Sequence, residues 1–165
     1  MRVTKRVIPV ALIGVVATFT FAVPAGADIE PYPSSVKPGS TNTVEFGIKH
    51  GCDESPTTKL AFQIPKGATK VTPQGATGWI GEVTGRVVTF TGGPLDANTS
   101  RKIGEIEFTA PKKTGTLYWK VVQTCEVGET RWVSKSEKAD HPAPAIKVGK
   151  AKKKESDKRP DEWDL

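Results

Sequence analysis

The chain has 165 residues, 36% of them hydrophobic, which is enough for one domain with a sizeable core but hardly for two. Its formal net charge of +6 belongs mostly to the two ends. The first six residues include Arg2, Lys5 and Arg6 and no acid, and the segment from Lys147 onward holds more Lys and Arg than Asp and Glu. The stretch between the ends is close to neutral. It has no basic stripe with interleaved aromatic residues, which argues against a nucleic-acid-binding protein.

The first 27 residues have the three-part pattern of a secretory signal. A basic start without acids precedes an apolar run over residues 7–22, and small residues lead up to Ala27. The run is shorter than the roughly 20 residues that a membrane span needs. We therefore predict a signal peptide over residues 1–27, a mature chain that begins at Asp28, and a secreted or extracytoplasmic protein. A retained N-terminal anchor is the alternative.

After residue 40, apolar residues alternate with polar or small ones, which is the period of a strand with one buried face. Turn-forming Gly and Pro residues separate these runs. No segment has a convincing helical pattern, and the longer apolar stretch at residues 116–124 predicts a central strand. The pattern predicts an all-β protein with a single β-sandwich. Its alternating apolar residues are Val44, Phe46, Ile48, Leu60, Phe62, Ile64, Val88, Phe90, Ile106 and Phe108.

The end of the chain has a different composition. Residues 150–165 are mostly charged and offer too little apolar area to order themselves. We predict a charged, disordered tail over residues 149–165, so that the folded domain covers residues 28–148. No second apolar span follows the first, and we expect no membrane anchor in the mature chain.

The sequence contains two cysteines, Cys52 and Cys125, both in the predicted mature part. Exported proteins meet an oxidising environment, in which an even number of cysteines favours a disulfide. The alternative is a thiolate pair that binds a soft metal ion such as Cu(I). Because the two cysteines lack the close spacing of a local metal motif, we predict the disulfide.

An enzyme has little support in the sequence. His50 and His141 are its two histidines, and no Gly-x-Ser-x-Gly, phosphate-binding loop or His-Glu-x-x-His pattern is present. Neither cysteine is available as a nucleophile if the disulfide forms. We predict that the protein is not an enzyme.

Several short motifs follow one another along the predicted domain. They are His50-Gly51-Cys52, Glu54-Ser55-Pro56-Thr57-Thr58-Lys59, Gly78-Trp79, Gln123-Thr124-Cys125-Glu126 and Trp132. This ordered set resembles the YcnI-like copper-binding domain family, over residues 28–148. The resemblance implies an exported β-sandwich, cupredoxin-like or immunoglobulin-like, that handles copper outside the cytoplasm. It also implies a disulfide between the two motif cysteines, and copper transport or delivery proteins as partners.

In that family the mature chain begins with histidine, whose amine and imidazole chelate one Cu(II) with the help of a glutamate and a nearby tryptophan. Here Asp28 stands in the place of that histidine, and we expect its amine and carboxylate to chelate copper less tightly. The resemblance assigns Trp132 to the tryptophan and Glu54 to the glutamate, with Glu105 as a second choice. The predicted metal site is therefore Asp28, Glu54 and Trp132, with Cu(II) as the cofactor.

Each candidate also has a purely structural interpretation. Trp132 suits a hydrophobic core, Glu54 a solvated loop and Asp28 a frayed terminus. His50 suits a hydrogen bond that shapes the cysteine loop, and His141 precedes a proline, which favours an extended segment. The sequence leaves two functions open. One is an exported copper-binding or copper-trafficking protein with a weakened site, and the other is an extracellular interaction module that has kept the sandwich and lost the metal.

Overall fold

The computed structural model describes residues 29–150, 159 and 161–164. The predicted signal peptide and Asp28 lie outside the described residues. Within them, no helix is long and apolar enough to cross a membrane. The elements are β1 (Ile29–Tyr32), β2 (Ser35–Val36), β3 (Thr41–Ile48), β4 (Thr57–Gln63), β5 (Thr69–Gly75), β6 (Trp79–Thr84), β7 (Val87–Leu95), β8 (Arg101–Thr109), β9 (Gly115–Tyr118), β10 (Lys120–Cys125), β11 (Glu129–Trp132), β12 (Ala145–Val148) and the 3-10 turn η2 (Asp161–Asp164).

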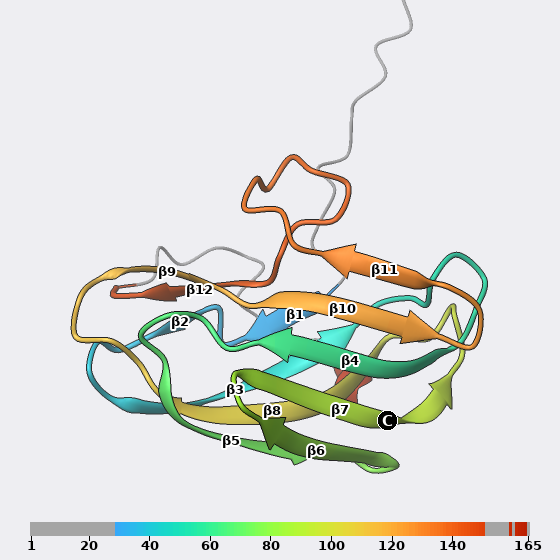
Figure 1. Ribbon diagram of the computed structural model, residues 1–165, viewed down its shortest axis with the longest axis horizontal. Coiled ribbons are helices and arrows are strands. Elements are labelled where there is room, and N and C mark those ends of the chain that lie inside the picture. Colours follow the sequence, from blue (N-terminus) through green and yellow to red (C-terminus); the bar gives the residue numbers. More distant parts are fainter. Residues whose placement is uncertain (1–28, 151–158, 160, 165) are drawn as a thin grey trace, which may run out of the picture.

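Two sheets lie face to face and form a β-sandwich, as predicted (Figure 1). One sheet has the strand order β1-β3-β8-β5, and the other has the order β11-β10-β4-β7-β6. A small third sheet, β2-β12-β9, lies at one end of the sandwich. The pairing of β1 with β3 brings the start of the described chain beside the end of β3, where the loop with the first cysteine begins.

The space between the two large sheets is filled by the apolar residues that the alternation singled out. All of them have a relative exposure of 6% or less. Their rings meet edge to face, with centroids 4.8 Å apart for Phe46 and Phe62 and 5.2 Å apart for Phe108 and Trp119. The predicted core is confirmed, because each strand turns one face toward the opposite sheet.

The apolar stretch at residues 116–124 forms two strands instead of one. β9 pairs with β12, whereas β10 lies between β4 and β11. Trp119 separates them; it is fully buried, and its backbone N–H donates to the Pro144 carbonyl at 2.9 Å. The chain changes sheets at this residue, so the prediction of a central strand holds for β10 alone.

A disulfide joins Cys52 to Cys125, as predicted, with the two Cα atoms 6.0 Å apart. Both cysteines are buried. The bond ties the loop between β3 and β4 to the end of β10 across 73 residues of sequence. Because the sulfur atoms are bonded to each other, the alternative of a Cu(I)-binding thiolate pair does not apply to this structure.

The last described residues pack on the outer face of the first sheet. Arg159 Nε donates to Glu45 Oε2 at 2.6 Å, and Trp163, in η2, is 5% exposed. A Cβ atom added to Gly47 would overlap the Trp163 indole, so glycine at this position on β3 makes room for the ring. The prediction of a disordered tail does not hold for these residues, because the indole of Trp163 packs over Gly47 on β3.

We expect Gly47→Ala to displace Trp163 and to lower the free energy of unfolding by about 1–3 kcal/mol, the scale of exposing one large apolar side chain. Urea unfolding of Gly47→Ala, Trp163→Ala and the double variant measures this. Because the added methyl group acts through the indole, the double variant should be no less stable than Trp163→Ala alone. Losses that simply add would contradict the packing of Trp163 on Gly47.

Candidate functional site

The loop between β3 and β4 carries the His-Gly-Cys motif and continues into a tight turn. The Ser55 N–H donates to the Cys52 carbonyl at 2.9 Å, and the Cys52 N–H donates to the Ser55 carbonyl at 3.2 Å. Asp53, at the tip, has a φ of 53°, a left-handed conformation that Asp adopts more readily than most residues. Asp53 and Glu54 are both exposed there. The turn thus presents two carboxylates, and the disulfide at Cys52 ties it to β10.

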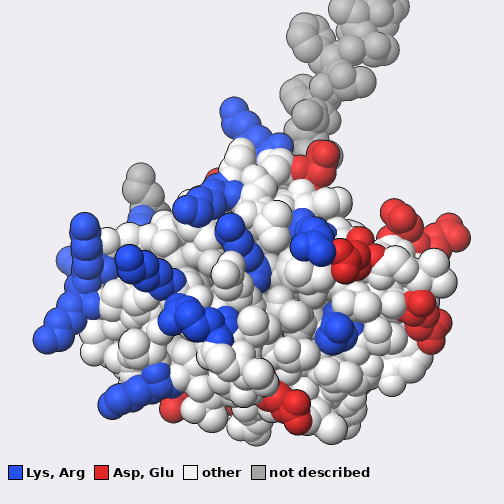
Figure 2. Space-filling model, in the orientation of Figure 1, with Lys and Arg blue, Asp and Glu red and all other residues white. Residues whose placement is uncertain are grey.

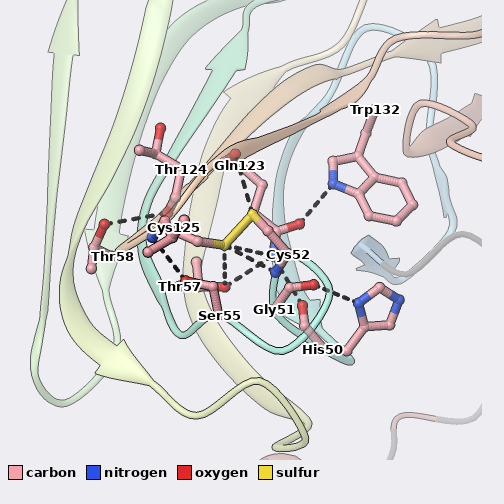
Figure 3. The surroundings of a disulfide bond; sticks show 11 residues. His50, Gly51, Cys52, Ser55, Thr57, Thr58, Gln123, Thr124, Cys125 and Trp132 are labelled. Atoms are coloured by element: carbon pink, nitrogen blue, oxygen red, sulfur yellow. Dashed lines mark hydrogen bonds between the residues drawn. A yellow bond between two sulfur atoms is a disulfide. The ribbon is translucent and has the colours of Figure 1, made fainter.

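Gln123 is fully buried on β10, and its side-chain amide connects β10 to β11, to β4 and to the loop between β3 and β4 (Figure 3). Its Oε1 accepts a hydrogen bond from Trp132 Nε1 at 2.8 Å. Its Nε2 donates to Thr57 Oγ1 at 2.9 Å and to the His50 carbonyl at 3.0 Å. A buried amide needs such partners, because each unpaired polar group is costly. We call these four groups the Gln123 network; it fixes Trp132 relative to the loop between β3 and β4.

The sulfur of Cys125 lies beside the Gln123 network. The Cys52 N–H donates to it at 3.0 Å, and it lies 3.8 Å from Thr57 Oγ1 and 3.9 Å from Gln123 Nε2. The disulfide and the network are therefore one packed unit. The His-Gly-Cys and Gln-x-Cys motifs, far apart in the sequence, meet in it.

Both histidines of the chain pack against Trp132, which is itself fully buried. The ring centroid of His50 lies 6.1 Å from that of Trp132, and the centroid of His141 lies 4.8 Å from it, edge to face. His50 Nδ1 is 2.7 Å from the Gly51 carbonyl oxygen. Because a carbonyl only accepts, Nδ1 carries the proton in the neutral ring and the lone pair is on Nε2.

The two histidines also line one hollow of about 450 Å³, which we call the histidine hollow. Its walls are His50, Gly51, Asp53, Glu129, Thr130, Arg131 and His141. Glu129 and Arg131 form an ion pair at 2.7 Å on its rim. In the part of the chain that the structure describes, no three His, Cys, Asp or Glu side chains are grouped closely enough to hold a metal ion. A metal shell here would need water or a further group besides the two imidazoles.

Charged side chains are unevenly spread over the face in Figure 2. Lys and Arg gather toward the end with β9 and β12, and Asp and Glu gather toward the end where β10 turns into β11. The loop of Cys52 lies at that same turn, because the Glu126 N–H donates to the Pro56 carbonyl at 2.9 Å and the Val127 N–H to Ser55 Oγ at 2.8 Å. The exposed acids of the two segments are Asp53, Glu54, Glu126 and Glu129. A concentration of acids favours cations nearby.

The predicted metal residues differ in how they relate to the Gln123 network and the histidine hollow. Trp132 belongs to the Gln123 network and contacts both histidines. Glu54 lies at the tip of the turn and is not among the residues that line the histidine hollow, whereas its neighbour Asp53 is. Glu105 lies on β8 and lines a separate hollow with Arg159 and Trp163.

Asp28 lies outside the described residues, but its neighbour in the chain does not. β1 begins at Ile29, which is fully buried and faces Ile48 in the β1–β3 register. His50 follows Ile48 by two residues. The N-terminal strand therefore starts next to the segment that carries one of the two histidines.

The role of Gln123 was not foreseen from the sequence, although a signal for it was present. Val121, Gln123 and Cys125 alternate along β10, and all three are buried. A polar residue that shares the face of two buried residues in a strand is expected to need buried hydrogen-bond partners. The approach of His141 to Trp132 had no such signal, because it depends on the path of the loop between β11 and β12.

Two stacked antiparallel sheets, with a disulfide that ties the loop between β3 and β4 to β10, define an immunoglobulin-like β-sandwich. Within that class, the chain belongs to the family described as "Domain of unknown function (DUF1775)", which matches residues 29–110 and 82–148. This is the family of the YcnI-like proteins, so the resemblance seen in the motifs is confirmed at the level of the family.

A solved structure with an immunoglobulin-like fold is similar to this chain over most of its length. An uncharacterized protein from Nocardia farcinica, described as having an immunoglobulin-like fold, is 15% identical with a TM-score of 0.62, over 74% of this chain and 98% of that one. A non-cellulosomal cohesin from Archaeoglobus fulgidus is 11% identical with a TM-score of 0.45, over 76% and 93% of the two chains. The sixth cohesin of scaffoldin B from Acetivibrio cellulolyticus is 9% identical with a TM-score of 0.45, over 75% and 99%. No curated protein matches the sequence significantly.

Proposed function

We propose that this chain is an exported copper-binding protein that holds Cu(II) beside Trp132, where the N-terminal strand begins. The observation that carries the proposal is that Trp132 meets both histidines at one hollow near the start of β1. A chain cut after Ala27 has its α-amine on Asp28, one residue before Ile29. One residue spans at most about 3.6 Å. The amine would therefore lie within about one residue length of Ile29.

The donor groups suit Cu(II), which prefers nitrogen ligands in tetragonal geometry. The amine and carboxylate of Asp28 form a chelate, and the imidazoles beside Trp132 are further nitrogen donors. The turn supplies a carboxylate, either from Glu54, as the family resemblance implies, or from Asp53, which lines the histidine hollow. The acids around the turn favour the approach of a cation.

The disulfide agrees with a location outside the cytoplasm, because such bonds persist in oxidising compartments. In this proposal copper is a cargo and the protein is not an enzyme. Its partners are copper transport or delivery proteins of the same compartment, which would exchange the ion at the exposed rim of the hollow.

The test compares protein that begins at Asp28 with protein that carries one additional N-terminal glycine. The extra residue turns the amine of Asp28 into an amide, so it should lower the affinity for Cu(II) at least about tenfold, which corresponds to roughly 1.4 kcal/mol. Isothermal titration with CuCl₂ measures the affinity. Asp28→His should bind more tightly than the unaltered protein, because copper prefers imidazole to carboxylate.

Equal affinities of the native and extended proteins would exclude the amine as a ligand. If neither protein binds Cu(II) even when the metal is in excess, the domain is better described as an extracellular interaction module on the same sandwich. The immunoglobulin-like fold is compatible with that second function.

A further inference from the structure

We propose that one end of the sandwich is a docking surface for an anionic membrane, to which the folded domain binds through lysine side chains and without insertion. This end, which we call the basic end, consists of the turn between β2 and β3, the turn between β4 and β5, the loop between β8 and β9, and β12 with the residues that follow it. The proposal concerns where the protein is held and does not depend on the binding of copper.

The segments of the basic end meet at the loop between β8 and β9. The Gly39 N–H donates to the Pro111 carbonyl at 3.1 Å, and a Cβ atom added to Gly67 would lie 3.3 Å from the Pro111 ring. β12 pairs with β9, so that Val148 lies opposite Gly115. Segments that are far apart in the sequence therefore contribute side chains to one surface (Figure 1).

The charged side chains of the basic end are all positive. The segments 34–40, 64–68, 109–118 and 145–150 contain no Asp or Glu. Within the described residues, none of their lysines forms an ion pair. Lys and Arg also gather toward this end in the face shown in Figure 2. The lysines, all exposed, are Lys37, Lys66, Lys112, Lys113, Lys147 and Lys150.

The acidic side chains lie at the other end of the sandwich. β4 begins beside the turn that contains Cys52 and ends at the basic end, so these two regions lie at opposite ends of one strand. The first region carries the exposed acids Asp53, Glu54, Glu126 and Glu129. An anionic surface attracts the basic end and repels the acidic end. It would thus orient the molecule with the histidine hollow facing away from the surface.

The shape and composition of the basic end favour a flat lipid surface over a single anionic chain. Proteins that bind a linear polyanion commonly hold it in a positively charged groove, whereas the lysines here project from turns and strand ends, and neither hollow described above lies among them. Clusters of about four to eight Lys or Arg bind anionic lipid headgroups by charge. The six described lysines reach that number, and three more follow Lys150 within four residues of sequence.

Nothing at the basic end would enter the hydrocarbon of a bilayer. The large hydrophobic side chains that are exposed in the described chain all lie outside its segments. Binding should therefore depend on charge alone and weaken as salt screens that charge.

The experiment measures how much of the protein that begins at Asp28 sediments with vesicles of phosphatidylcholine and phosphatidylglycerol in equal parts. One variant combines Lys112→Glu with Lys113→Glu, at the basic end. Its matched control combines Lys59→Glu with Lys138→Glu, which changes the net charge equally at exposed lysines outside the basic end. Circular dichroism establishes that both variants are folded.

The native protein should sediment with these vesicles, and not with vesicles of phosphatidylcholine alone. The variant at the basic end should bind at least about tenfold more weakly than its control, because each lysine near an anionic membrane adds to the attraction. Raising the NaCl concentration should release the native protein from the vesicles.

Equal binding of the variant and its control would overturn the proposal, because the total charge and not the basic end would then decide the affinity. Binding that persists at high salt would contradict docking by charge. Inorganic polyphosphate serves as a second probe. Native protein that binds polyphosphate but not the vesicles would identify a linear polyanion as the partner and overturn the assignment to a membrane.

Discussion

Replacing Gln123 by Met should lower the free energy of unfolding by about 3–5 kcal/mol. Methionine has nearly the shape of glutamine, so the core stays filled, but it cannot pair with Trp132 Nε1, the Thr57 hydroxyl or the His50 carbonyl. Each buried polar group that loses its partner costs about 1–3 kcal/mol, and the Thr57 hydroxyl can rotate to limit its own loss. Urea unfolding followed by far-ultraviolet circular dichroism measures the change.

Gln63→Met is the matched control for this prediction. Gln63 lies on β4 and is exposed, so the same replacement should change stability by no more than about 0.5 kcal/mol. The emission of Trp132 should shift in Gln123→Met and stay unchanged in Gln63→Met, because the indole N–H loses its acceptor in the first variant alone. Equal stability of the two variants would mean that the Gln123 network does not contribute to the fold.

The second large effect is expected at the disulfide. Cys52→Ser should destabilise the protein by roughly 2–5 kcal/mol, the usual range for a native disulfide in a small secreted domain. The bond closes a loop of 73 residues, and the chain-entropy model gives roughly 4 kcal/mol for loops of this order. The Cys125 sulfur also accepts the Cys52 N–H, so its surroundings are disturbed as well. The midpoint of urea unfolding reports the loss.

Two controls separate the bond from the side chains. The native protein unfolded in the presence of a reductant should be destabilised about as much as the Cys52→Ser and Cys125→Ser double variant. Non-reducing peptide mapping should recover the two cysteines in one linked pair. Recovery of two free thiols from natively purified protein would contradict the structure at this point.

The sandwich and its core could be predicted because the alternation along a strand has a direct physical cause. Residues such as Phe46 and Phe62 must face the opposite sheet, and their neighbours then face water. The disulfide could be predicted because the chain has two cysteines and the pattern of an exported protein. Trp132 was singled out through the family motifs, and the structure adds the contacts that fix it.

Other features depend on contacts between distant segments, which a local pattern does not contain. At Trp119 the chain passes from β9, in the small third sheet, to β10, in a large sheet. The residues before and after Trp119 are similarly apolar, so the sequence does not show this change of sheet. The ordered Trp163 depends on a single glycine, Gly47, more than a hundred residues earlier. Similarly, the conformation of the turn decides that Asp53, and not Glu54, faces the hollow. The copper ligands at Asp28 and Glu54 stay predictions.

The burial of Ile29 has a consequence for the removal of the predicted signal peptide. With the predicted cut after Ala27, one residue, Asp28, separates the scissile bond from Ile29, the first described residue that pairs with β3. A peptidase holds several residues on each side of the bond in an extended groove, and Ile29–Tyr32 cannot enter such a groove while they are part of the sheet. Processing should therefore precede the docking of β1, and a mutant chain that folds before it is cut should keep its leader.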